Sequence, residues 1–175
     1  ANPQRDSTAL TIARVNLATI NDPGLRAPSY EILYRQLWTG VKHAALYGQV
    51  LSLVGTWNAR FLVVDATGVG AGLAAFLERS LGSRVLPFVF NSKTKSDLGW
   101  AFISLVDSGR LKTYAPDPST TSQLTDTHQL FLKQLEYCQY EIQPGPDKKI
   151  KWRVPDGARD PATGELIHDD LAISA

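Results

Sequence analysis

Segments with a β-strand pattern alternate with segments of helical spacing along most of this 175-residue chain. Short apolar runs, or apolar residues in strict alternation, predict strands, and apolar residues three and four apart predict helices. Strands are expected at residues 8–17, 30–39, 60–65 and 84–90, with a short one near residue 111. Helices are expected at 43–57, from the glycine-rich segment 67–72 to residue 81, at about 95–106, and from residue 125 or 126 onward. This alternation favours an α/β fold whose sheet is at least partly parallel.

The C-terminal third adds a hairpin to this pattern. Strands are expected at 140–143 and 150–154, and Pro144-Gly145-Pro146-Asp147 between them has strong turn chemistry. A last helix follows residue 170. Since no repeat or low-complexity tract occurs, residues 1–175 are interpreted as a single domain.

Composition excludes several classes of protein. Hydrophobic residues make up 43% of the chain and charged residues 20%, which is typical of a globular domain. No apolar stretch approaches the roughly 20 residues that a membrane span needs, and no secretory signal is recognisable. The single cysteine cannot form an internal disulfide, which favours a reducing compartment. Because the chain contains no methionine, we expect it to be a fragment of a longer protein.

Two adjacent carboxylates near the C-terminus are the first candidate site. Asp169 and Asp170 directly precede the apolar run Leu171-Ala172-Ile173. Neighbouring carboxylates repel each other, and a hard divalent cation cancels that repulsion. The alternative is structural, because a helix cap and a residue favoured by the helix dipole give the same pattern. His168 is expected to support this site or to form the turn, rather than to bind metal directly.

A third carboxylate, Asp65, ends the apolar run 61–64 and precedes the glycine-rich turn. Open α/β sheets place their ligands at the carboxyl ends of strands, and a helix N-terminus favours phosphate. Alternatively, Asp65 only accepts hydrogen bonds from the turn. If the fold brings Asp65 to Asp169 and Asp170, the three carboxylates form a site for Mg²⁺ or Mn²⁺.

Basic residues form two candidate nucleic-acid contacts. Lys93 and Lys95 lie in a hydroxyl-rich segment that opens a helix. The predicted hairpin carries a second basic group, which consists of Lys148, Lys149, Lys151 and Arg153. Trp152 lies between two of these residues, so the group combines basic and aromatic side chains. Ordinary solvated lysines, or lysines that protect an edge strand, would give the same patterns. Asp6, at the foot of the first strand, is interpreted as a turn residue, a helper carboxylate or a neighbour of a metal site, and it is the weakest of the candidate metal ligands.

The order of these motifs resembles the C-terminal nuclease domain of the large terminase subunit of tailed bacteriophages. The matching stretches are Asp6-Ser7-Thr8-Ala9-Leu10, Val63-Val64-Asp65-Ala66-Thr67-Gly68-Val69-Gly70, Phe90-Asn91-Ser92-Lys93-Thr94-Lys95, Gln134-Leu135-Glu136-Tyr137 and His168-Asp169-Asp170-Leu171-Ala172-Ile173-Ser174-Ala175. The resemblance implies a ribonuclease-H-like mixed sheet flanked by helices, here with an additional β-hairpin. It also implies an endonuclease that cuts concatemeric double-stranded DNA.

The mechanism that the resemblance implies is phosphodiester hydrolysis with two divalent ions. Asp65 would bind or bridge both ions and Asp169 or Asp170 would hold one, while the lysines contact the DNA backbone. The family's other essential acid lies on a first strand that should precede Ala1, so the fragment is expected to bind metal poorly or to be inactive by itself. An N-terminal ATPase domain is likewise expected outside this sequence.

The resemblance also implies partners and a location. The full-length protein would bind the portal or procapsid and the small terminase subunit, in the host cytoplasm and without a membrane. Three alternatives stay open. The first is a different ribonuclease-H-like nuclease, such as a junction resolvase or a transposase-like enzyme. The second is a non-catalytic module that binds a nucleotide, and the third is a non-catalytic module that binds procapsid proteins.

Overall fold

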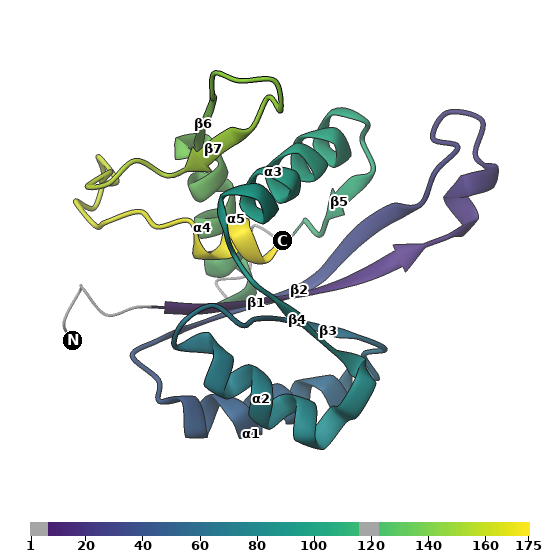
Figure 1. Cartoon of the computed structure of the whole chain (residues 1–175), viewed down its shortest axis with the longest axis vertical. Coiled ribbons are helices and arrows are strands. Elements are labelled where there is room, and N and C mark those ends of the chain that lie inside the picture. The colour runs from purple at the N-terminus through teal and green to yellow at the C-terminus, as the bar shows by residue number, and fades with distance from the viewer. Residues whose placement is uncertain (1–6, 116–122) are drawn as a thin grey trace. The chain divides into compact units, whose positions relative to one another are not determined.

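The computed structural model describes residues 7–115 and 123–175, and these fall into two compact units (Figure 1). The first unit comprises residues 1–39 and 96–175, and the second comprises residues 40–95. Residues 92–95, at the start of one helix, therefore belong to the second unit. Each unit is described by itself below.

The first unit is built around a three-stranded mixed sheet in the order β1-β2-β5. Its elements are β1 (Ser7–Asn16), η1 (Ala18–Asn21), β2 (Ser29–Thr39), most of α3 (Ser92–Asp107), β5 (Leu111–Thr113), α4 (Gln123–Tyr137), β6 (Gln139–Ile142), β7 (Ile150–Arg153) and α5 (Asp170–Ser174). Strands β1 and β2 pair antiparallel from Ser7 opposite Thr39, with one irregularity between Ile12 and Ala13. Strand β5 pairs with β2 in parallel.

Helices α4 and α5 cover this sheet, α4 against β2 and α5 against β1. Each of these elements contributes a buried apolar side chain, among them Ile32 of β2, Phe131 of α4 and Leu171 of α5. Full burial of one such apolar side chain stabilises the fold by about 1.5–3 kcal/mol. The short helix α5 is therefore held mainly by packing, because five residues cannot form a stable helix alone.

The β6–β7 hairpin packs against α3 through one face of β7. Ile150 and Trp152 are buried, and the Trp152 ring stacks on the Phe102 ring with the centroids 6.3 Å apart. Close approach depends on Gly99, because a Cβ atom there would lie 2.5 Å from two Trp152 ring atoms. The Ser96 hydroxyl also accepts the Ile150 N–H at 2.9 Å.

The second unit pairs two parallel strands with two helices. Its elements are α1 (His43–Thr56), β3 (Leu62–Asp65), α2 (Gly70–Leu81), η2 (Gly82–Arg84) and β4 (Val85–Phe88). Helices α1 and α2 lie side by side, and α2 packs on both strands (Figure 1). Leu46, Val50, Leu73 and Leu77 form the buried face of the helices. A parallel pair needs such a crossover, and α2 supplies it.

The sequence patterns predicted these elements well, including the hairpin, and the predicted mixed sheet flanked by helices is confirmed. Helix α3 begins at Ser92, three residues before its predicted start. The reason is a reciprocal cap: the Asn91 side chain accepts the N–H of Thr94, and the Thr94 hydroxyl accepts the N–H of Asn91. Among the described residues, no helix has the length and apolar character to cross a bilayer.

Candidate active site

Asp65 ends β3 and organises the turn that follows it. Burial alternates along β3, so Val63 and Asp65 lie on its exposed face while Leu62 and Val64 are half-buried. Asp65 Oδ1 accepts the N–H of Thr67 at 2.7 Å. The Thr67 hydroxyl in turn accepts the N–H of Phe90 at 2.8 Å, which ties this turn to the segment after β4. The carboxylate is thus held in place, and part of it stays accessible to solvent.

Two glycines of this turn have defined structural reasons. Gly68 has φ of +54°, a conformation that other residues rarely adopt. A Cβ atom on Gly70 would lie 2.4 Å from the backbone oxygen of Asp65. The turn that presents Asp65 therefore requires glycine at position 70, whether or not a phosphate ever binds there.

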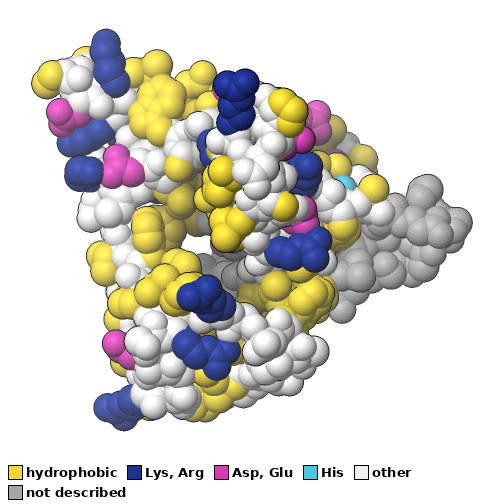
Figure 2. Space-filling model, turned by 90° about the vertical axis from the view of Figure 1, so that its right-hand side faces the viewer, with side chains coloured by type: hydrophobic (Ala, Val, Ile, Leu, Met, Phe, Trp, Pro, Cys, Tyr) yellow, Lys and Arg dark blue, Asp and Glu magenta, His cyan; other side chains and the backbone are white. Residues whose placement is uncertain are grey.

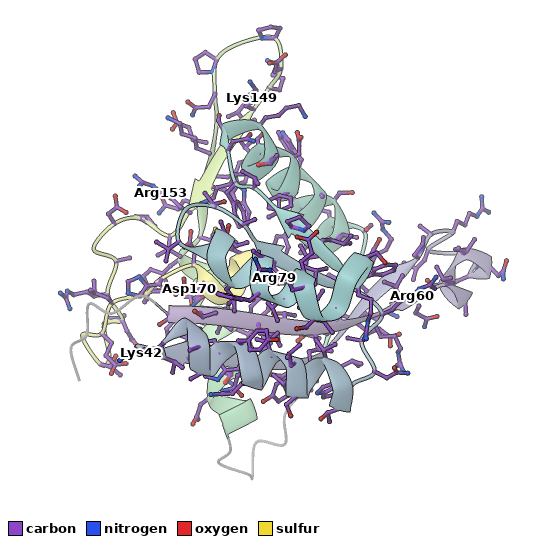
Figure 3. The ribbon with its side chains drawn as sticks, turned by 60° about the horizontal axis from the view of Figure 1, so that its bottom comes forward. Lys42, Arg60, Arg79, Lys149, Arg153 and Asp170 are labelled. Atoms are coloured by element: carbon purple, nitrogen blue, oxygen red, sulfur yellow. The ribbon has the colours of Figure 1, made fainter. Side chains whose placement is uncertain are left out.

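The acidic pair lies at the start of α5. Asp169 is the N-cap residue and Asp170 the first helical residue, and both are half-buried, whereas His168 is exposed. The next two residues, Leu171 and Ala172, are at most 1% exposed. Leu171 and Ala172 of α5 are thus buried, while Asp170 lies at the N-terminal end of the helix (Figure 3) and Asp169 directly precedes it.

Helix α4 holds this acidic segment at two points that the sequence patterns do not predict. The side-chain oxygen of Gln134 accepts the backbone N–H groups of Leu171 at 2.8 Å and of Ala172 at 3.1 Å. Lys133, the residue directly before Gln134, forms an ion pair with Asp160 in the loop that leads to the acidic pair. Gln134 belongs to a stretch that carries the family resemblance, which was the available signal.

The ion pair changes the acid strength of both partners. The hydrogen bond from Lys133, followed by the one from the Ala162 N–H, holds the pKa of Asp160 below its usual value. The same contact raises the pKa of Lys133. Asp160 is 7% exposed, so its charge depends on this partner.

The structure brings Asp169 and Asp170 together, and it assigns Asp65, Lys93 and Lys95 to the other unit. Within neither unit do three or more His, Cys, Asp or Glu side chains of the described residues group closely enough to hold a metal ion. Asp6 lies outside the described residues. A site that joins Asp65 to the acidic pair therefore stays a prediction.

The basic candidates occupy two surfaces. Lys93 is exposed and Lys95 half-buried in the first turn of α3. In the first unit, Lys148, Lys151 and Arg153 are exposed and Lys149 is half-buried, and Figure 3 shows Lys149 and Arg153 at the hairpin. Arg153 pairs with Asp156 and Lys149 with Asp147. On the face shown in Figure 2, Lys and Arg side chains are scattered among acidic and hydrophobic ones.

One part of the hairpin prediction is wrong. Trp152 was expected among the basic residues of a nucleic-acid surface, but its side chain is 6% exposed. Side chains alternate across a strand, so Ile150 and Trp152 face α3 while Lys151 and Arg153 face outward. The outward face of β7 is therefore basic without an aromatic residue to stack on bases.

Comparison with known proteins gives a family match over most of the chain. Residues 4–149 match the model of the family described as the terminase RNaseH-like domain. A curated relative, the probable terminase ATPase subunit of Haemophilus phage HP1, is 25% identical over 93 residues. That match covers 53% of this chain and only 15% of the relative's length.

Three solved structures resemble the fold. The large terminase nuclease of thermophilic phage G20c with bound cobalt gives a TM-score of 0.60 at 17% identity, and with bound magnesium 0.59 at 15%. Each match covers 97% of this chain and 78% of the other. The large terminase nuclease domain of Thermus phage P74-26 gives 0.56 at 14% identity, covering 97% and 76% of the two chains. At these identities, the likeness is one of fold.

Proposed function

The chain belongs to the terminase RNaseH-like domain family, and on that premise we propose that it is the nuclease domain of a bacteriophage DNA-packaging terminase. In this proposal it hydrolyses phosphodiester bonds of concatemeric double-stranded DNA and depends on a divalent metal. The observation that carries the proposal is the family match over residues 4–149, joined to the fold likeness with three terminase nucleases.

The residues proposed to hold metal are Asp65, Asp169 and Asp170, with Asp6 as a weaker further ligand. All four offer carboxylate oxygens, the donors that Mg²⁺ and Mn²⁺ prefer. The exposed face of β3 and the half-buried start of α5 both leave carboxylates near the surface, as a ligand site requires. The G20c nuclease structures with cobalt and with magnesium support a divalent metal of this kind. His168 is proposed to support one of these carboxylates.

When bound, two such ions would activate water and stabilise the leaving 3′ oxygen. The chain's own contribution is to hold the carboxylates in place. The Thr67 N–H orients Asp65, and Gln134 of α4 holds the N–H groups of Leu171 and Ala172, the two residues that directly follow the acidic pair. Lys93 and Lys95, together with the basic hairpin residues, are proposed to bind DNA phosphates, which carry no sequence information.

The partners are proposed at the level of the full-length protein. Double-stranded DNA is the substrate, and the portal or procapsid and the small terminase subunit are the protein partners, in the host cytoplasm. The chain spans a small part of the length of its curated relative. The partners are therefore proposed for the full-length protein and not for this domain alone.

The test is a supercoiled-plasmid cleavage assay with Mg²⁺, Mn²⁺ or EDTA. It compares the chain with a version extended upstream, because the first-strand acid is expected there. Asp65→Asn keeps an oxygen that can accept the Thr67 N–H, so the turn should survive while cleavage falls by a factor of 100 or more. Asp169→Asn and Asp170→Asn, assayed singly, identify the direct ligand.

Glu78→Gln on α2 is the matched control for Asp65→Asn, because it also removes one exposed carboxylate from the second unit. It should cleave at the parent rate. In whichever of the two forms cleaves the plasmid, cleavage by Asp65→Asn at the parent rate would refute the assignment. Preferential cutting of a four-way junction over linear duplex would instead favour a resolvase.

A further inference from the structure

The amide oxygen of Gln134 makes two hydrogen bonds to a helix 37 residues further along the chain. It accepts the N–H of Leu171 at 2.8 Å and the N–H of Ala172 at 3.1 Å. Gln134 itself is 2% exposed, so water does not compete for this acceptor. A hydrogen bond of this kind, buried at both ends, is expensive to leave unmade.

The two donors occupy the second and third positions of α5. In most helices these are the N–H groups that the N-cap side chain accepts. Asp169 is the N-cap residue here and has a side chain suited to that role, yet it makes no side-chain cap hydrogen bond. Gln134 thus caps α5 from another helix, and the N-cap carboxylate is not used for capping.

Further contacts fix the rest of the segment. At the other end of α5, the hydroxyl of Ser174 lies 2.8 Å from that of Thr11 on β1. On the approach to α5, Lys133 holds Asp160. The five residues of α5 are thereby fixed to α4 and to β1, which is more support than a helix of this length has by itself.

We infer that Gln134 is a positioning residue for the acidic pair. Its side chain satisfies the N-terminal N–H groups of α5, which fixes the backbone from which the Asp169 and Asp170 carboxylates project. The inference rests on the proposed function, because a position matters for catalysis only if these carboxylates hold metal. Residues that orient metal ligands affect metal affinity by about 10- to 100-fold when they are replaced.

The choice of glutamine over glutamate has a physical reason. Both side chains offer an acceptor oxygen of the same reach, but glutamate adds a negative charge at the start of the helix that carries the acidic pair. Neutral glutamine supplies the cap without this added charge. A role of this kind therefore needs the acceptor oxygen and not the charge.

The experiment compares four variants with the parent, in the chain and in its upstream-extended form. Gln134→Leu removes the acceptor at similar volume, and Gln134→Glu retains it. Gln134→Asn shortens the side chain by one methylene, which moves the acceptor oxygen away from the α5 N–H groups. This variant replaces Gln134→Leu in the test if the leucine variant does not fold. Thr11→Val is the matched control, because it removes the hydroxyl contact at the opposite end of α5.

Two quantities are measured in each protein. Amide hydrogen exchange at Leu171 and Ala172 reports the cap directly and needs no metal. The concentration of Mg²⁺ or Mn²⁺ at half-maximal thermal shift reports metal affinity without catalysis. We expect Gln134→Leu to lose amide protection and to need about 10- to 100-fold more metal. Gln134→Asn should change in the same direction, Gln134→Glu should keep the protection and most of the affinity, and Thr11→Val should keep the parent's metal midpoint.

The outcomes separate this inference from the proposed function. If the parent binds metal and Gln134→Leu or Gln134→Asn loses the amide protection with an unchanged metal midpoint, Gln134 is only structural and the inference is wrong. An equal shift of the metal midpoint in Thr11→Val would also overturn it, because general loosening of α5 would then explain the effect. If neither parent form binds metal or cleaves DNA, the proposed function fails and the positioning role fails with it.

Discussion

The guanidinium carbon of Arg35 lies 3.7 Å from the centre of the Phe131 ring, in the layer between β2 and α4. Arg35 is 1% exposed, and its Nη1 donates to the Thr113 hydroxyl at 3.0 Å. Among the residues that the structure describes, the Nε and Nη2 atoms have no hydrogen-bond partner and no carboxylate pairs with the group. Burial accordingly lowers the pKa of Arg35.

Replacement of this buried cation by an apolar side chain should be tolerated. The contact with the Phe131 ring is worth about 2 kcal/mol when desolvated, but removing an ion from water costs several kcal/mol. We therefore expect Arg35→Met to equal or exceed the parent in free energy of unfolding. Arg35→Lys should be less stable by about 2 kcal/mol or more, because a compact ammonium is more strongly hydrated and cannot stack. Urea unfolding measures both, and a methionine variant less stable than the lysine variant would contradict the argument.

His128, which lies close enough to Arg35 to be affected by its charge, should make the stability of the fold sensitive to mild acid. Desolvation, followed by the charge of Arg35, lowers the pKa of His128, and its Nδ1 has no hydrogen-bond partner in the described part of the chain. In the unfolded chain, histidine gains a proton near pH 6.5, which the folded state resists. The free energy of unfolding should therefore have its full value above pH 7 and should fall as the pH drops towards 5. His128→Leu should flatten this slope in thermal unfolding, whereas His168→Gln, which changes an exposed histidine, should keep it.

The Lys133–Asp160 pair should act in a different pH window. Because the folded-state pKa of Asp160 is lowered, its contribution is present above the unfolded value of about 3.9 and is lost as the pH falls through the folded pKa. The raised pKa of Lys133 adds a loss above about pH 10. The difference in unfolding free energy between the parent and Asp160→Asn should be constant from pH 5 to 9. It should shrink below about pH 4, and a difference that grows with acid would contradict the pairing.

Replacement of Gly99 by alanine should destabilise the fold. Alanine there places Cβ 2.5 Å from the Trp152 ring, which is held by its stack on Phe102. Overpacking costs about 1–3 kcal/mol, which exceeds the gain of about 1 kcal/mol in helix propensity. Gly48→Ala on α1 is the control, because no described atom outside the adjoining residues and the helix backbone lies within 4 Å of that Cβ, and the variant should be stabilised. Denaturant midpoints of both variants decide the point.

Local patterns predicted most of the fold. The spacing of apolar residues located α1, α2 and α4, and turn chemistry located the β6–β7 hairpin. The burial of Trp152 also follows from strand alternation, since Lys151 and Arg153 are its outward-facing neighbours. The prediction for Trp152 fails because residues that are neighbours in a strand sequence point to opposite faces of the strand.

Tertiary contacts were beyond the sequence patterns. Nothing local to Gln134 indicates that its oxygen caps a helix 37 residues away. The residues around Arg35 in β2 are a mixture of polar and apolar types, so the sequence pattern does not predict that Arg35 is buried. Its burial on Phe131 depends on how α4 packs. For the candidate site, the sequence predicted the carboxylates and their places at element ends, while the contacts that hold them came from the structure.

The outward face of β7 provides a direct test of DNA binding. Lys151 is exposed and lies opposite Glu141 in the hairpin register, between the two basic residues that have acidic partners. If Lys151 contacts a phosphate, Lys151→Ala should weaken duplex binding equally for all sequences, because phosphate contacts do not read bases. It should also reduce the slope of log affinity against log salt by about 1. Lys112→Ala, which removes an exposed lysine from β5, should leave the slope unchanged. Fluorescence anisotropy in EDTA measures both, and equal slopes for Lys151→Ala and the parent would remove Lys151 from the proposed DNA surface.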